Sequence, residues 1–128
     1  PNSTRRLRDA CFDYALGWAD DAEPYLHAAR LLALPPPAEW DDVQTLWLRR
    51  VSVTRWPGLV RDALARLLAE PRGGRVLGIG VHPWLLGAPH RIRYLREALE
   101  DLAARPGLHL ATPGALARHA GAVLSRAG

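Results

Sequence analysis

One apolar segment, residues 75–81, constrains the fold of this chain more than any other part of the sequence. Arg75 to Val81 is apolar at nearly every position, and Pro71, Gly73 and Gly74 separate it from a helical pattern. A strand that is apolar at consecutive positions is typically covered on both faces, as in a parallel sheet. We therefore predict a buried strand that is followed at once by His82.

Helical patterns alternate with other short apolar segments. Apolar residues recur at helical spacing from Leu59 to Leu68, and Pro57 suits the first turn of that helix. This alternation predicts an α/β fold built from βα units, with parallel strands and covering helices. We predict helices that begin near Ser3, Pro57, Pro89 and Thr112, and further strands at residues 14–18, 30–34 and 108–111.

Two segments are less clear. Trp40 to Val53 fits a helical pattern in its first part and strand alternation in its second, so we predict a loop followed by mixed structure. This segment contains the acidic pair Asp41 and Asp42, which could serve a function or only cap the loop. Cys11, the single cysteine, shares a helical face with apolar residues, and we expect it to be buried.

The composition is that of a soluble globular chain, with 48% hydrophobic and 23% charged residues. All 17 basic residues are arginine, but they alternate with apolar and acidic residues, so we expect a solvated surface and no nucleic-acid partner. No apolar run approaches the roughly 20 residues that span a bilayer, so we expect no membrane partner. No secretory signal is visible, so we expect a cytoplasmic protein. Because methionine is absent, we expect the chain to be part of a longer protein.

His82 is the strongest candidate for chemistry. It follows the predicted strand 75–81, and the carboxyl ends of parallel strands line the active face of such folds. Its ordinary pKa near ~6.5 lets it give or take a proton at neutral pH. From position alone, acid–base catalysis and a simple hydrogen bond to the loop are equally supported.

Five further residues could support such a site. Asp20 and Asp21 are adjacent carboxylates beside Trp18, and could orient a catalytic group or only cap their loop. Trp84 lies in the loop after His82, where an indole could pack on a sugar ring or a flat amide, or could anchor the core. His90 opens the next helix and could face the same loop. No metal-ligand spacing is visible, so we predict no metal ligand in this chain.

Several of these segments resemble the polysaccharide deacetylase superfamily. The sequence from Gly80 to Gly87 (GVHPWLLG), continuing to Pro89-His90-Arg91, is similar to its C-terminal motif, closest to the peptidoglycan-deacetylase-like and allantoinase-like branch. Trp18 to Asp21 with Pro24-Tyr25 resembles the acidic motif of that branch, and Leu32 to Asp42 resembles its next strand and loop. The ending from Leu110 to His119 also fits, so the resemblance covers nearly the whole chain.

The resemblance implies an incomplete, distorted (β/α)7 barrel that hydrolyses an amide. Family members hold a divalent, zinc-like metal with one aspartate and two histidines in their N-terminal half, and a late histidine protonates the leaving amine. In this chain that histidine is His82. We therefore expect residues 1–128 to form a single partial domain, the C-terminal half of such a catalytic domain, which lacks the metal-binding half and binds no metal alone.

The resemblance leaves three functions open. The complete protein could remove the acetyl group from an N-acetylated sugar or polysaccharide, or it could open a small cyclic amide as an allantoinase does. Alternatively, the chain could be a structural or binding fragment without catalysis. Because half a barrel exposes strand edges and an apolar face, we expect its partner to be the missing N-terminal half or a second copy.

Overall fold

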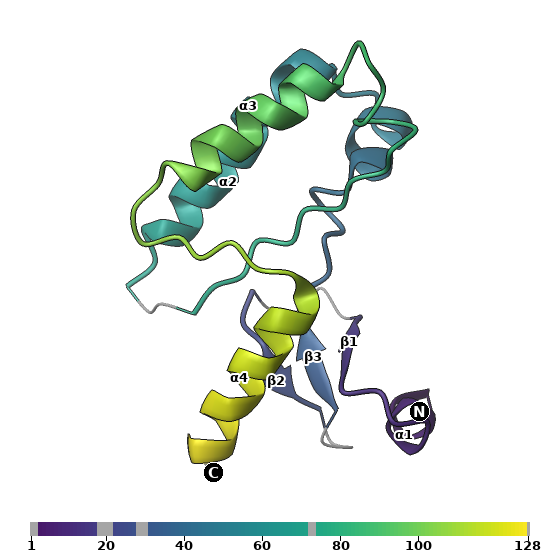
Figure 1. Cartoon of the computed structure of the whole chain (residues 1–128), viewed down its shortest axis with the longest axis vertical. Coiled ribbons are helices and arrows are strands. Elements are labelled where there is room, and N and C mark those ends of the chain that lie inside the picture. Colours follow the sequence, from purple (N-terminus) through teal and green to yellow (C-terminus); the bar gives the residue numbers. More distant parts are fainter. Residues whose placement is uncertain (1–2, 18–21, 28–30, 72–73, 128) are drawn as a thin grey trace. The chain divides into compact units, whose positions relative to one another are not determined.

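The computed structural model describes residues 3–17, 22–27, 31–71 and 74–127, and divides the chain into two compact units (Figure 1). Unit 1 comprises Pro1–Pro36, Gly74–Val76 and Ala111–Gly128, and unit 2 comprises Pro37–Gly73 and Leu77–Leu110. Among the described residues, no helix is long and apolar enough to cross a membrane.

Unit 1 is a small sheet with a helix packed on it. Strand β3 (Leu32–Leu34) is central, and it pairs in parallel with β1 (Tyr14–Leu16) and antiparallel with β2 (Tyr25–Leu26). All three residues of β3 are buried, and Leu32 and Leu34 pack with Ala117 and Ala120 of helix α4 (Pro113–Ala127). The N-terminal helix α1 (Ser3–Asp9) precedes β1.

The sheet is mixed, which corrects the prediction of parallel strands. Strand β2 was not predicted, and only residues 27–31 connect it to β3. A parallel crossover needs a dozen or more residues, so such a short connection permits only an antiparallel pair. The His27 N–H donates to the Leu31 carbonyl at 3.0 Å and closes this turn.

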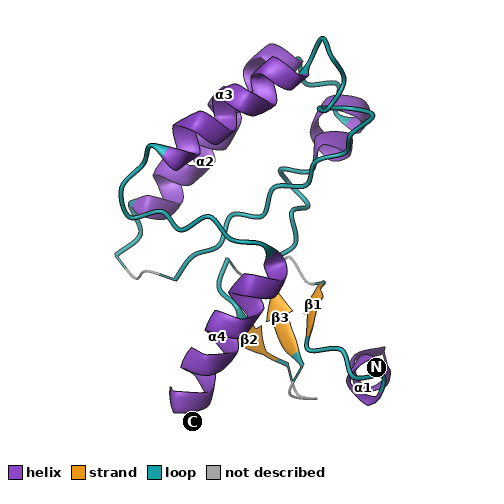
Figure 2. Cartoon of the chain, viewed as in Figure 1, coloured by secondary structure: helices purple, strands orange, loops and turns teal. Residues whose placement is uncertain are grey.

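Unit 2 is built on two helices that lie side by side, α2 (Trp56–Leu68) and α3 (Ile92–Ala103) (Figures 1 and 2). Both were predicted from helical spacing, although α3 begins three residues after Pro89. A π-helix, η1 (Val43–Leu48), and a short 3-10 helix, η2 (Val53–Arg55), precede α2. The buried core consists of Trp56, Val60, Leu64, Leu86, Ala98 and Leu102.

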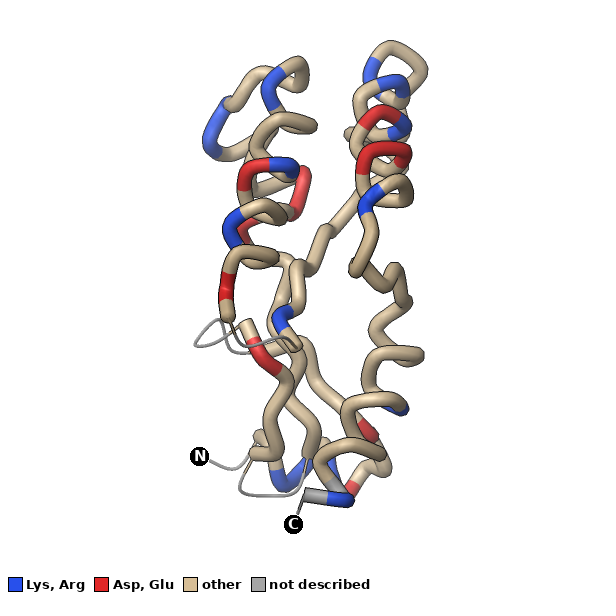
Figure 3. Tube along the Cα trace, turned by 90° about the vertical axis from the view of Figure 1, so that its left-hand side faces the viewer, with Lys and Arg blue, Asp and Glu red and all other residues tan. Residues whose placement is uncertain are grey.

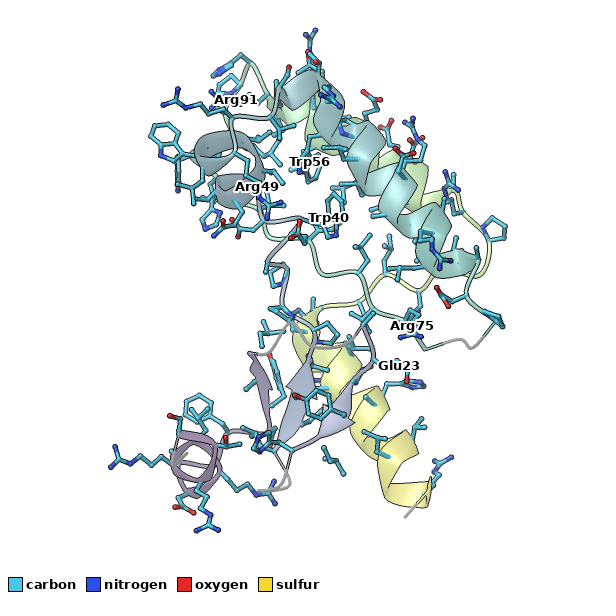
Figure 4. All side chains as sticks on the ribbon, turned by 180° about the vertical axis from the view of Figure 1, so that it is seen from behind. Glu23, Trp40, Arg49, Trp56, Arg75 and Arg91 are labelled. Atoms are coloured by element: carbon cyan, nitrogen blue, oxygen red, sulfur yellow. The ribbon has the colours of Figure 1, made fainter. Side chains whose placement is uncertain are left out.

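Trp56 is the largest residue in this core and is fully buried. Figure 4 shows its side chain and that of Trp40 inside unit 2, near helix α2. Trp40 and Leu46 pack against the core from the segment 40–53. The segment that was hardest to interpret from sequence therefore contributes apolar side chains to the core, which explains its mixed pattern.

Residues 75–81 and 108–111 are not strands, which corrects two predictions. A strand needs a ladder of successive backbone bonds. Within the described residues, segment 75–81 makes isolated ones: Val76 N–H donates to the Ala22 carbonyl at 2.7 Å, and the Gly80 carbonyl accepts from Asp42 N–H at 3.0 Å. Leu77 and Ile79 still pack against the core of unit 2, so the apolar pattern records burial without a sheet.

Cys11 is exposed, so the prediction of a buried cysteine was wrong. Helix α1 ends at Asp9, and Cys11 has a φ of 61°, in the left-handed region that ends helices. The turn takes Cys11 off the helical face on which the prediction rested. Figure 3 shows arginine and acidic positions mixed along the trace of unit 2. In unit 1, Arg75 pairs with Glu23 at 3.4 Å.

Candidate active site

The candidate site lies in unit 2, where the loop at Asp42 meets the segment 80–86. Asp42 precedes helix η1, and its side chain is completely buried. Its Oδ2 accepts the backbone N–H of His82 at 2.9 Å and that of Leu86 at 3.2 Å. Its own N–H donates to the Gly80 carbonyl at 3.0 Å. One carboxylate therefore holds both ends of the turn that carries His82.

The remaining oxygen of Asp42 binds the imidazole of His82. The distance from Asp42 Oδ1 to His82 Nδ1 is 2.6 Å, and a carboxylate can only accept, so Nδ1 carries the proton. This fixes the orientation of the ring and leaves Nε2 as the nitrogen that can exchange a proton with another molecule. The His82 side chain is 42% exposed, so it remains accessible.

The pair favours a charged histidine. The hydrogen bond that His82 donates to Asp42 raises the pKa of His82 above its ordinary value of 6.5. Partial desolvation opposes this rise, and the charges of Asp42 and Asp41 add to it. More of the imidazole is then protonated at neutral pH than for a free histidine. A histidine in this state, with one nitrogen fixed, can act as a general acid.

Asp41 has a different task from its neighbour. Its Oδ1 accepts the backbone N–H groups of Val43 at 2.9 Å and Gln44 at 3.2 Å, and so caps the first turn of η1. Its carbonyl accepts the N–H and the hydroxyl of the buried Thr45, both at 3.0 Å. Asp41 thus shapes the helix, whereas Asp42 positions the histidine.

Two glycines make the close approach possible. A Cβ on Gly80 would lie 2.6 Å from Asp41 Oδ2, and a Cβ on Gly87 would lie 2.5 Å from the Pro83 carbonyl oxygen. Real Cβ atoms do not approach other atoms so closely, so a larger residue at position 80 would displace the Asp41 side chain, and one at position 87 would displace the backbone of the turn. Gly80 and Gly87, on either side of His82, therefore contribute to the site because they have no side chain that would occupy this space.

One exposed indole contacts His82, and a second exposed indole contacts the first. The ring centroids of Trp84 and His82 are 5.9 Å apart and their planes are tilted by 53°. Trp47, from η1, meets Trp84 edge to face, also at 5.9 Å between centroids and with an angle of 82°. The aromatic side chains extend the site from His82 across two segments that are far apart in sequence.

Asp41, Asp42 and His82 each offer a ligand atom within 4.8 Å of the others, which raises the question of a metal. Two ligands of one tetrahedral zinc, each about 2.1 Å from it, lie about 3.4 Å apart, but Asp42 Oδ1 and His82 Nδ1 are only 2.6 Å apart. Asp42 Oδ2 and Asp41 Oδ1 already accept backbone donors. The three residues fit a hydrogen-bonded pair with a cap and do not fit a metal site.

The structure brings together only part of the predicted site. His82 and Trp84 lie beside each other, whereas His90 is exposed in the turn before α3, and no hydrogen bond or ring contact within the described residues links it to His82. Trp18, Asp20 and Asp21 lie outside the described residues. The sequence drew attention to the acidic pair Asp41 and Asp42, but no pattern in it identified Asp42 as the residue that binds His82.

Comparison with solved structures shows that the chain has an α/β fold already known from an enzyme. That structure is described as the crystal structure of PuuE allantoinase; it matches with a TM-score of 0.83 and 24% sequence identity. The match covers 95% of this chain but 43% of the allantoinase chain, so this chain spans less than half of that length. No family model and no curated protein matches the sequence.

Proposed function

We propose that this chain supplies the acid half of a metal-dependent hydrolase that cleaves carbon–nitrogen amide bonds, in the manner of the polysaccharide deacetylase superfamily. The observation that carries the proposal is the Asp42–His82 pair, with its 2.6 Å bond at Nδ1 and a completely buried carboxylate. A histidine that is held in this way is suited to protonate a leaving nitrogen, which departs from a tetrahedral intermediate only as an amine.

The residues of the chain divide this task between them. Asp42 keeps the proton on Nδ1 and stabilises the charged imidazolium, so that Nε2 presents its proton outward. The bonds from Asp42 to His82 N–H and Leu86 N–H hold the turn in place while this proton moves. Proton transfer from Nε2 to the departing nitrogen would complete cleavage of the C–N bond, and His82 would then be neutral.

The metal that such hydrolases use is not assigned to this site. Asp41, Asp42 and His82 do not fit a metal ion, so the one aspartate and two histidines of the family motif would lie elsewhere in the complete protein. On this proposal the chain is the C-terminal half of a (β/α)7 barrel, residues 1–128 are one partial domain of it, and an N-terminal half or a second copy completes it. We propose a cytoplasmic location for this protein.

The most favoured reaction within this class is N-deacetylation of an N-acetylated sugar or polysaccharide, because the motif from Gly80 to Gly87 resembles that family. A second candidate is hydrolysis of a small cyclic amide. The observation that favours it is the likeness to PuuE allantoinase over 95% of this chain. Both reactions need a proton for the leaving nitrogen, so His82 has the same role in each.

The test is His82→Ala in the complete protein, assayed for acetate release from N-acetylated oligosaccharides and for opening of cyclic ureides. General acid catalysis typically contributes about 10²–10⁴-fold, so kcat should fall by that order while bound metal stays unchanged. The matched control is His109→Ala, an exposed histidine of unit 2, which should leave kcat near that of the wild type.

Two results would refute the assignment. One is a near-normal kcat for His82→Ala with full metal occupancy, since His82 would then only brace its loop. The other is loss of the metal in His82→Ala, which would make His82 a ligand. Melting temperature, measured on the same preparation, separates a loss of rate from a loss of fold.

A further inference from the structure

Thr45 is the buried threonine of unit 2, and the proton transfer proposed above does not use it. Its residue is 3% exposed, whereas Thr54, the other threonine of unit 2, is exposed. Threonine is a poor helix former, and a buried hydroxyl must find a hydrogen-bond partner. A valine of nearly the same shape would fill this position without that requirement, so the hydroxyl itself needs an explanation.

The hydroxyl of Thr45 binds the peptide that joins Asp41 to Asp42. Thr45 Oγ1 donates to the Asp41 carbonyl at 3.0 Å, and the Thr45 N–H donates to the same carbonyl at 3.0 Å. Two donors therefore engage the two lone pairs of that oxygen. The Thr45 carbonyl accepts the Val51 N–H at 3.0 Å, so Thr45 is itself held by the segment after η1.

The other end of the same peptide leads directly to the site. In a planar trans peptide the C=O and N–H groups point in opposite directions, so a bond that orients one also orients the other. The N–H of this peptide belongs to Asp42 and donates to the Gly80 carbonyl at 3.0 Å. The Cα of Asp42 follows that nitrogen, and its carboxylate lies 2.6 Å from His82 Nδ1. Thr45 thus acts on the point from which the Asp42 side chain starts.

We propose that Thr45 is a positioning residue for the proton donor, whose hydroxyl orients the peptide before Asp42 so that the carboxylate meets His82; this inference rests on the proposed function and adds a residue to it. Without the hydroxyl, the Asp41 carbonyl keeps one bond, from the backbone N–H, and can pivot about it. The hydroxyl also polarises the peptide, which strengthens the bond that its N–H donates to Gly80. Removal of the hydroxyl should therefore weaken the bond between Asp42 and His82 while η1 stays folded.

The alternative is that the hydroxyl only supports η1, since threonine hydroxyls in helices can bind the carbonyl four residues earlier. The two roles predict different results for Thr45→Val, which exchanges the hydroxyl for a methyl group. A merely structural hydroxyl would affect the melting temperature and leave the imidazole of His82 unchanged. A positioning hydroxyl affects the imidazole of His82 even in a folded variant.

The experiment compares two pairs of proteins that differ in the hydroxyl: the wild type with Thr45→Val, and Thr45→Ser with Thr45→Ala. The first measurement is an NMR titration of the imidazole Cε1–H signals of the 128-residue chain, which has five histidines; the signal that His82→Ala lacks is that of His82. The bond to Asp42 is the main cause of the raised pKa of His82. This pKa should fall toward its ordinary value in Thr45→Val and Thr45→Ala and stay raised in Thr45→Ser.

The second measurement is kcat of the complete protein. It should fall about fivefold in Thr45→Val and Thr45→Ala, as expected for one hydrogen bond of about 1 kcal/mol, and stay near that of the wild type in Thr45→Ser. Thr54→Val is the matched control, because Thr54 is exposed and its hydroxyl bonds that of Ser52 at 2.8 Å. The control should change neither the pKa of His82 nor kcat.

Two results would overturn the role of Thr45. One is a pKa of His82 in Thr45→Val equal to that of the wild type. The other is an equal loss in Thr45→Ser and Thr45→Ala, because packing of the methyl group would then be the cause; this pair also decides the question if Thr45→Val does not fold. The titration involves no turnover, so its failure leaves the result for His82→Ala intact. A lowered pKa without any effect of His82→Ala on kcat would support the positioning by Thr45 and refute the acid.

Discussion

The two units of the chain secure their backbone in different ways. In unit 1, a three-stranded ladder joins β1, β3 and β2, and the buried strand β3 packs under α4. In unit 2, the segments near residues 42 and 82 pair through no strand within the described part of the chain. The buried carboxylate of Asp42 joins them instead, together with one backbone bond from Asp42 N–H to the Gly80 carbonyl. The connection between backbone segments is therefore spread over a ladder in the first unit, whereas at the site in the second unit it depends mainly on one side chain.

The difference shows what a site requires that a core does not. In a ladder, the backbone N–H and C=O groups of the strands bind one another, so these groups fix the backbone and have no other role. A carboxylate can fix two backbone amides and still tune the imidazole of His82, so the same atoms serve structure and chemistry. Substitutions in unit 2 should therefore differ widely in their effect on its stability.

Four of the five tryptophans belong to unit 2, so tryptophan fluorescence can follow its unfolding.

The largest effect is expected for Asp42→Ala. This change leaves two N–H groups, those of His82 and Leu86, without their acceptor, and each unsatisfied buried donor costs about 1–3 kcal/mol. We expect a loss of about 3 kcal/mol, measured by urea unfolding with tryptophan fluorescence. Asp41→Ala removes only a helix cap and should cost about 1 kcal/mol. Equal losses for the two variants would show that Asp42 does not hold the turn.

Gly87→Ala should have the next largest effect. Its Cβ would meet the backbone of Pro83, and backbone atoms cannot rotate away as a side chain can. Overpacking of this kind costs about 1–3 kcal/mol, so the melting temperature should fall. In Gly58→Ala, a control in helix α2, the new Cβ meets nothing within 4 Å. The control should raise the melting temperature, because alanine favours a helix by up to about 1 kcal/mol.

A smaller effect concerns pH. The pKa of His82 is raised in the folded chain, so the stability that the pair contributes is fully present below about pH 6.5 and is lost as the pH rises through the raised value. Asp42→Asn should return the pKa of His82 toward about 6.5. Titration of the imidazole Cε1–H signal by NMR measures both values. If the pKa of His82 is the same in Asp42→Asn as in the wild type, the Asp42 carboxylate is not the cause of the raised pKa.

The smallest effect is expected at the surface of unit 2. Arg49 binds Glu39 through two nitrogens, at 2.6 and 3.1 Å, and this lowers the pKa of Glu39. Both side chains are at least half exposed, where water and salt screen the attraction. Glu39→Gln should change the melting temperature by only a few degrees at pH 7. A shift as large as that of Asp42→Ala would show that unit 2 depends on its surface charges as well.

Local patterns predicted much of the fold. Apolar residues at helical spacing gave α2, and Thr112-Pro113 gave the start of α4, where the Thr112 hydroxyl accepts the N–H of Ala115. His82 was predicted to follow a strand, and it instead follows an irregular apolar segment that packs against the core of unit 2. The pattern of residues 75–81 was read as a strand because consecutive apolar residues report burial, and they do not report whether a neighbouring backbone supplies a ladder.

The partner of His82 could not be predicted in the same way. Asp42 is 40 positions away, and neither residue carries a spacing signal that links it to the other. Asp41 and Asp42 are identical in type and adjacent, yet one caps η1 and the other is completely buried. Only the path of the chain decides which of two neighbouring carboxylates turns inward.

The bond between Asp42 and the turn 82–86 also has a consequence for the order of folding. Closing a loop of about 40 residues costs entropy before any contact repays it, whereas a helix forms from contacts near in sequence. Helix α2 lies within that loop and can form first, and its packing brings the ends together. We therefore expect the bonds between Asp42 and the turn 82–86 to be the last part of unit 2 to form, after helix α2 is in place.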